Sequence, residues 1–82
     1  MSTIDYEKLI AALDLRGVSR RRLARELDVS RSTIMRILSG KHRPSYFTAN
    51  GIAEALDLSG RECLEIFFPR YAASGDRLDV YE

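Results

Sequence analysis

The apolar residues between positions 19 and 40 recur at the spacing of two short amphipathic helices. The two apolar sets are Leu23, Ala24 and Leu27, and Ile34, Ile37 and Leu38. Ser19 and Ser30 each precede one pattern, where a hydroxyl can cap the free backbone amides of a first helical turn. Only residues 28–30 separate the two patterns, so the helices must meet at a steep angle. This arrangement predicts a helix-turn-helix.

Two further amphipathic patterns predict helices on either side of this pair. The first covers residues 1–15; Ser2 or Thr3 is expected to cap it and Gly17 to end it. The second follows Pro44 and begins at a Ser45 cap. Their buried stripes are Tyr6, Leu9, Ile10 and Leu13, and Ala49, Ile52, Ala53 and Leu56.

Gly51 lies inside the second of these helices, where glycine costs about 1 kcal/mol relative to a good helix former. We expect it to be a tolerated weak point. The alternative is that another backbone passes close to it.

The segment from Ser59 to Glu62 has the form of a capping box, which predicts a fifth helix that Pro69 ends. This helix has more apolar area than one buried stripe needs, in Cys63, Leu64, Ile66, Phe67 and Phe68. The surplus predicts a dimer interface containing Leu64, Phe67, Phe68 and Tyr71. Alternatively, Phe67 and Phe68 simply cover a thin hydrophobic core of the same chain. The predicted fold is all-α, with five helices in residues 1–69.

Residues 70–82 form a short tail in which Ala72 to Gly75 is expected to be a flexible joint. Leu78 and Val80 alternate with polar neighbours, a weak strand signal. The tail is either an arm that pairs with a partner subunit or a frayed end.

The net charge of +1 conceals a strong partition along the chain. Residues 16–43 contain nine basic and two acidic residues, a net charge of +7, whereas residues 1–15 carry −2 and residues 44–82 carry −4. A basic run can be only a solvated face. Here it coincides with the helix-turn-helix, which favours nucleic-acid binding.

The composition excludes several other classes of protein. Eighty-two residues make one small domain, and there is no apolar run of membrane-spanning length and no apolar signal core near the N-terminus. A single cysteine, Cys63, fits a reducing cytoplasm. One His and one Cys cannot close a zinc site, and His42 has no recognisable nucleophile or orienting partner. We therefore expect no metal, no cofactor and no enzymatic activity.

The segment from Ser19 to Gly40 resembles the helix-turn-helix of the phage lambda Cro and repressor family, also called the XRE family. The resemblance extends over roughly Tyr6 to Phe68, including the loop at 41–45 and the fourth and fifth helices at 52–59 and 64–67. Two positions depart from the family pattern. Asp28 stands where the family often has Gly, and Arg20 where it often has Gln.

The resemblance implies that Arg31, Ser32 and Arg36 contact bases, and an arginine can bond both N7 and O6 of guanine. Met35 and the methyl group of Thr33 can contact a thymine methyl. The alternative for both arginines is contact with phosphate alone. Expected phosphate contacts are Ser19, Arg20, Arg21, Lys41, His42, Arg43, Ser45 and Tyr46. Arg22 and Arg25 are interpreted as solubilising.

These observations favour a sequence-specific transcription regulator, most simply a repressor that binds a pseudo-palindrome as a homodimer. Half-site centres would lie about 34 Å apart or a multiple of it. One alternative is an antitoxin-like or adaptor protein that binds a protein partner through its fifth helix and tail and DNA only for autoregulation. Another is a nonspecific architectural DNA binder.

Overall fold

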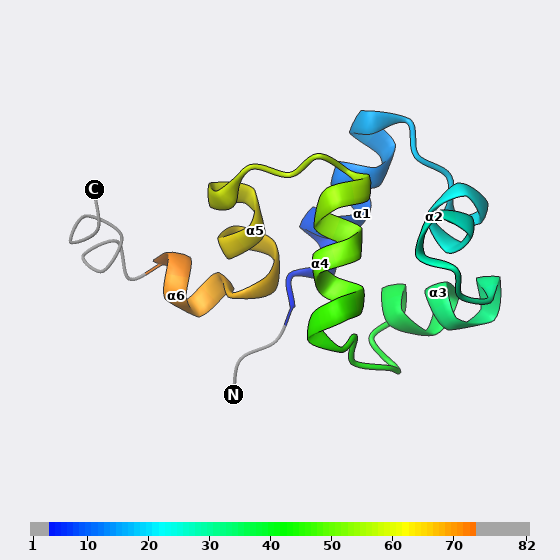
Figure 1. Cartoon of the computed structure of the whole chain (residues 1–82). Coiled ribbons are helices and arrows are strands. Elements are labelled where there is room, and N and C mark those ends of the chain that lie inside the picture. Colours follow the sequence, from blue (N-terminus) through cyan, green and yellow to red (C-terminus); the bar gives the residue numbers. More distant parts are fainter. Residues whose placement is uncertain (1–3, 74–82) are drawn as a thin grey trace.

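The computed structural model describes residues 4–73, and all of its regular structure is helical (Figure 1). Its elements are α1 (Tyr6–Arg16), α2 (Arg20–Leu27), α3 (Arg31–Leu38), α4 (Tyr46–Ala55), α5 (Gly60–Phe67) and α6 (Pro69–Ala73). The predicted all-α class is therefore confirmed. The short α6 is an addition to the five expected helices.

Four of the predicted helix caps are present, and each forms in the same way. The side-chain oxygens of Ser19, Ser30, Ser45 and Ser59 each accept a hydrogen bond from the backbone N–H three residues later. The fifth cap was predicted wrongly. Asp5, not Ser2 or Thr3, caps α1, because the helix begins only at Tyr6; Ser2 and Thr3 lie outside the described residues. The carboxylate of Asp5 also suits the positive end of the helix.

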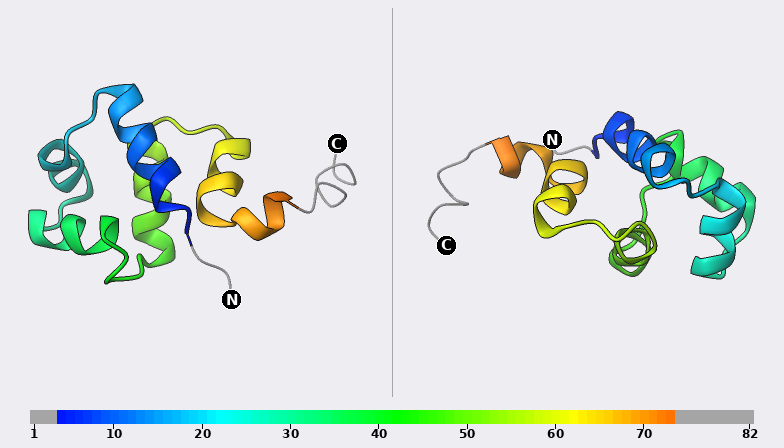
Figure 2. Two further views of the ribbon diagram at one scale, coloured as in Figure 1. Left: turned by 180° about the vertical axis from the view of Figure 1, so that it is seen from behind. Right: turned by 90° about the horizontal axis from the view of Figure 1, so that it is seen from above.

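The helices divide into two groups around α4. In Figure 1, α1 crosses behind α4, the pair α2–α3 lies on one side, and α5–α6 lies on the other; the two views in Figure 2 show the same order. The most deeply buried side chains come from α1, α2, α3, α4 and the residue that caps the end of α4, and they form one core cluster. They are Leu9, Leu13, Leu23, Ile34, Ile37, Ile52 and Leu56. This core fixes α2 and α3 relative to the rest of the chain.

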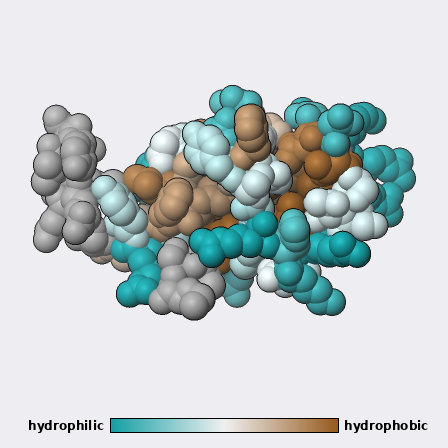
Figure 3. Space-filling view, turned by 60° about the horizontal axis from the view of Figure 1, so that its bottom comes forward, coloured by the Kyte–Doolittle hydropathy of each residue, from teal (hydrophilic) through white to brown (hydrophobic). Residues whose placement is uncertain are grey.

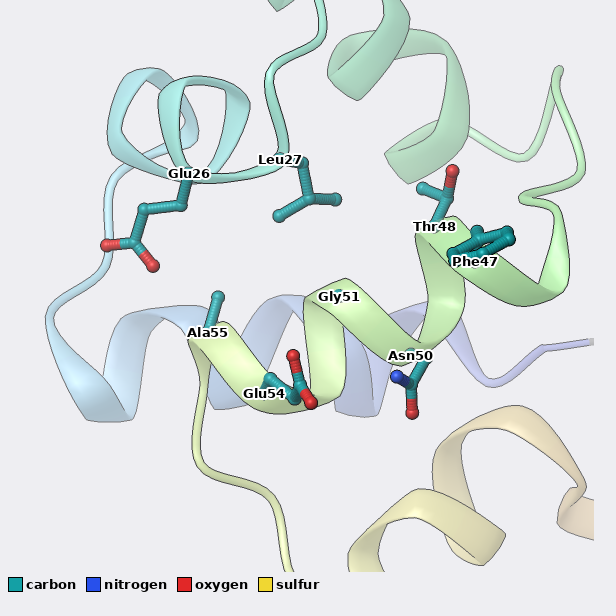
Figure 4. A pocket seen from close by; sticks show the side chains of 8 residues that line it. All are labelled: Glu26, Leu27, Phe47, Thr48, Asn50, Gly51, Glu54 and Ala55. Atoms are coloured by element: carbon teal, nitrogen blue, oxygen red, sulfur yellow. The ribbon is translucent and has the colours of Figure 1, made fainter.

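Gly51 lies where α4 passes α2. A Cβ atom added at Gly51 would stand 3.3 Å from Cγ of Leu27, which is tighter than ordinary van der Waals contact. Figure 4 shows the Leu27 side chain directed towards α4 at this position. Gly51 is thus a site of close helix approach and not simply a tolerated weak point. The approaching group is a side chain, not the backbone that the alternative proposed.

The C-terminal part of the fold differs from its prediction. Pro69 follows the end of α5 as expected, but it also begins α6, where its fixed φ angle suits a first helical position. Ala72 and Ala73, expected in a flexible joint, are helical and belong to α6, which packs against α5. The remaining tail residues, 74–82, lie outside the described part of the chain.

Candidate nucleic-acid interface

The helices α2 and α3 pack closely through small and apolar residues. Ala24 is only 5% exposed, and Ile34 is completely buried. Val29, in the turn, packs against the core, and its backbone N–H donates to the carbonyl oxygen of Ala24 at 3.0 Å. Asp28 adopts a left-handed conformation with φ of 57°. The turn therefore has the geometry for which the family often uses glycine, at some conformational cost to aspartate.

This packing leaves one face of α3 open to solvent. Arg31, Ser32, Met35 and Arg36 are all exposed, as the helical periodicity predicted. Thr33 is half-buried, and its hydroxyl lies 2.8 Å from the hydroxyl of the capping Ser30. Four of the five expected base-contacting residues therefore share an accessible face, while Thr33 is engaged in the helix cap.

The basic residues of the motif are mostly without intramolecular partners. Within residues 4–73, no ion pair or side-chain hydrogen bond involves the side chains of Arg20, Arg21, Arg25, Arg31, Arg36, Lys41 or Arg43. Arg22 differs, because its Nε donates to Glu26 at 2.7 Å along α2. Seven cationic groups in the basic segment are thus available to bind an anion.

The start of α2 and the exposed face of α3 meet at a shallow hollow. Its lining residues are Ser19, Arg20, Arg21, Arg31 and Met35. The hollow therefore joins expected phosphate contacts on α2 with expected base contacts on α3. The N-terminal end of α2 adds free backbone amides, which favour an anion.

The remaining expected phosphate contacts follow α3. Lys41, His42 and Arg43 are exposed, and the backbone N–H groups of Lys41 and His42 both donate to the carbonyl oxygen of Arg36. The backbone of this loop is therefore anchored to the end of α3. Ser45 caps α4, and the side chain of Tyr46 is 83% exposed.

Phe47 is an exposed aromatic residue that the sequence reasoning missed. It is 87% exposed beside Tyr46 and lines a groove between α2 and α4 (Figure 4). Its position outside the buried stripe of α4 was the available signal, because an apolar residue there has no place in the core.

The expected dimer residues have different environments in the single chain. Phe67 is 9% exposed and belongs to the core, whereas Leu64 is half-buried. Phe68 and Tyr71 are 57% and 38% exposed. Within one chain, Phe67 thus serves as a core residue, and the outward part of this set consists mainly of Phe68 and Tyr71.

An apolar cleft lies between the start of α4 and α5. It is lined by Ile4, Arg43, Pro44, Ser45, Tyr46, Ala49, Asn50, Ala53, Cys63, Phe67 and Phe68. Figure 3 shows apolar surface towards α5 and α6 and also, more strongly coloured, towards the α2–α3 side, with hydrophilic side chains around both. Cys63 is half-buried; its burial, reinforced by the charge of Glu62, raises the pKa of its thiol. The cleft is therefore largely apolar, but its lining also includes Arg43, Ser45 and Tyr46, which are expected phosphate contacts.

Residues 4–73 hold no group of three or more His, Cys, Asp or Glu side chains arranged for a metal ion. No helix in the same span has both the length and the apolar character needed to cross a membrane.

One face of α3 is buried, its opposite face is exposed and basic, and a tight turn joins it to α2. These features define the class of helix-turn-helix DNA-binding domains. Comparison with known families agrees, since a helix-turn-helix family model matches residues 9–63. The chain belongs to the XRE family of Cro/repressor-like helix-turn-helix proteins, a family of DNA-binding transcription regulators and not of enzymes. Comparisons with curated proteins and with solved structures gave no match.

Proposed function

We propose that the protein is a sequence-specific repressor that binds a pseudo-palindromic operator as a homodimer. The observation that carries this proposal is the exposed face of α3, where Arg31 and Arg36 have no partner among the described residues. Two guanidinium groups on the exposed face of a helix suit the major groove of DNA. Repression follows if the operator overlaps a promoter and the bound protein blocks polymerase.

The reading face consists of α3 side chains. Arg31 and Arg36 each bond a guanine through N7 and O6, and Ser32 contacts a neighbouring base. The two flanking phosphate segments are held by side chains at the start of α2 and after α3. They are Ser19, Arg20, Arg21, Lys41, His42, Arg43, Ser45 and Tyr46. Because these phosphate contacts carry no sequence information, specificity depends on α3.

The proposed dimer interface uses residues of α5 and α6, and Figure 1 shows these helices on the opposite side of α4 from α2 and α3. Phe68 and Tyr71 supply exposed area there, and the half-buried Leu64 accepts a hydrogen bond at its carbonyl oxygen from the backbone N–H of Phe68. A two-fold interface would use the same residues from both copies. The regulator acts in the cytoplasm, where its DNA lies and the thiol of Cys63 stays reduced.

Selection of bound sequences from a random DNA pool tests the proposal and defines the operator. Arg36→Ala should then cost about 1–3 kcal/mol on that operator and relax base preference at one position. Arg25→Ala is the matched control, because it removes an exposed, unpaired arginine of α2 that is not proposed to contact bases. Equal losses for Arg36→Ala on operator and random DNA would contradict base reading.

Two further measurements separate the proposal from nonspecific binding and from a monomeric mode. The selected operator should bind roughly a thousandfold or more tightly than random DNA. Sedimentation at micromolar concentration should give twice the monomer mass, and Phe68→Asp should reduce it. A monomer both with and without DNA would contradict the dimer.

A second candidate function is favoured by the apolar cleft between α4 and α5. Such a cleft suits an apolar segment of a partner protein. The charged residue in its lining is Arg43, and the acidic residues that give positions 44–82 a net charge of −4 lie outside that lining. The chain would then be an adaptor or antitoxin-like protein, with DNA binding for autoregulation. Stoichiometric copurification with the product of a neighbouring gene favours it; a stable homodimer that binds one operator tightly contradicts it.

A further inference from the structure

Met35 is the one long apolar side chain on the exposed face of α3. It is 51% exposed and does not belong to the hydrophobic core, whose α3 members are Ile34, Ile37 and Leu38. Its neighbours on that face, Arg31, Ser32 and Arg36, are all polar. Folding therefore gives no reason for a thioether at this position.

The surroundings of Met35 combine apolar and cationic groups. It lines the hollow between α2 and α3 together with Ser19, Arg20, Arg21 and Arg31. Apart from the aliphatic stems of the arginines, Met35 is the only apolar side chain in this lining. A group that enters the hollow meets an apolar surface within a positive rim.

The major groove offers few groups that suit such a surface. Most base edges present hydrogen-bond donors or acceptors, which would lose water against a thioether and gain no partner. The exception is the methyl group at C5 of a pyrimidine, which thymine carries and cytosine acquires by methylation. An apolar side chain in this groove therefore selects that methyl group.

Thr33 is the other α3 residue with a methyl group suited to this contact. It is half-buried, and its hydroxyl lies 2.8 Å from the hydroxyl of Ser30 in the helix cap. Met35 is more exposed and lines the hollow, whereas Thr33 does not. The structure thus favours Met35 over Thr33, although the sequence allowed both residues to make this contact.

Resting on the proposed mode of DNA binding, we infer that Met35 is a receptor for the C5-methyl group of one pyrimidine in each half-site. Arg31 lies four residues earlier on the same face, about 6 Å along the helix axis at 1.5 Å per residue. The base pairs of DNA are about 3.4 Å apart along its axis. The methylated pyrimidine therefore lies within about two steps of the guanine bonded by Arg31.

Removing one methyl group at a time from the operator tests this inference. Each thymine of one half-site of the selected operator is replaced in turn by deoxyuridine, which removes only the methyl group. At one position wild-type affinity should fall about fourfold, the factor that corresponds to the ~0.8 kcal/mol for burying one such group. Met35→Ala should bind the thymine and deoxyuridine forms of the operator equally, and Met35→Leu should again bind the thymine form more tightly. A Thr33→Ser variant, which keeps the capping hydroxyl, should discriminate as the wild type does.

A second arm of the experiment distinguishes the source of the methyl group. Cytosine and 5-methylcytosine, each paired with guanine, are compared at the sensitive position. Tighter binding of 5-methylcytosine, lost in Met35→Ala, shows that the methyl group alone is read; equal binding assigns the receptor to thymine.

Two results would overturn the inference. They are equal wild-type affinity for thymine and deoxyuridine at every position, or undiminished discrimination by Met35→Ala. Failure of the proposed function is distinguishable, since selection would then yield no preferred sequence at all.

Discussion

Replacing Gly51 with alanine sets two effects of similar size against each other. In an unconstrained helix the change stabilises the fold by about 1 kcal/mol, because glycine is a poor helix former. Here the new Cβ would lie 3.3 Å from Cγ and 3.6 Å from Cδ2 of Leu27. Leu27 is half-buried and packs against the core, so it must shift by a few tenths of an ångström. Overpacking typically costs about 1–3 kcal/mol, and so small a shift belongs at the lower end. We expect a net change near zero.

A double-mutant cycle measures the opposing terms separately. Urea denaturation followed by circular dichroism gives the free energy of unfolding for Gly51→Ala, Leu27→Ala and the double variant. Leu27→Ala alone lowers it, and once Leu27 is truncated Gly51→Ala should recover its full gain of about 1 kcal/mol. Asn50→Ala is the control, since this exposed neighbour should give the same small gain in both backgrounds. A gain of about 1 kcal/mol with Leu27 intact, roughly 4–8 °C in Tm, would refute the close approach.

Three other predictions concern single groups. Asp28→Gly should raise the thermal midpoint by the equivalent of about 0.5–1 kcal/mol, because a φ angle of 57° is strained for aspartate but not for glycine. A lower midpoint would instead show that the carboxylate of Asp28 stabilises the fold. Hydrogen bonds from the backbone N–H of Ser59 and the guanidinium of Arg16 lower the pKa of Glu62. The contribution of the Glu62 carboxylate to stability is therefore complete above the ordinary carboxyl pKa, and it is lost as pH falls through the lowered pKa of the folded state. Glu62→Gln should therefore flatten the acid limb of stability against pH, and parallel curves for the two proteins would contradict this. Burial raises the pKa of Cys63, so an alkylating reagent at neutral pH should modify the folded chain more slowly than the urea-unfolded chain; equal rates would count against burial of the thiol.

The features predicted correctly from the sequence depend on neighbouring residues. A cap such as Ser19 bonds the backbone amide of Arg22, three positions away, so the local sequence contains both partners. The same holds for the capping box of Ser59 and Glu62. The inward and outward faces of α3 follow from its helical repeat alone.

The features that were not predicted depend on contacts between segments that are distant in the sequence, or on which of several nearby polar residues caps a helix. Leu27 approaches Gly51 only because α2 and α4 cross, and Arg16 bonds Glu62 across 46 positions at 2.9 Å. The start of α1 depends partly on the backbone N–H of Asp5, which donates to the carbonyl oxygen of Ile66 at 2.8 Å. No periodicity encodes such pairs.

The candidate site shows the same division between local and tertiary information. Its basic residues were evident as a charge block, but which of them stay unpaired was not. Arg16 is bonded to Glu62 and Arg22 to Glu26, whereas Arg31 and Arg36 face solvent. The hollow beside Met35 and the exposure of Phe47 also required the packed helices.

The unpaired cations of the motif have a consequence for the free protein. Like charges held on one small surface repel each other, so they lower the stability of the folded state. Added salt weakens that repulsion, and a bound polyanion both removes it and stabilises the native state by mass action. DNA binding and stability are thereby coupled: we expect a DNA-bound copy to resist unfolding, and proteolysis of the unfolded state, better than a free copy.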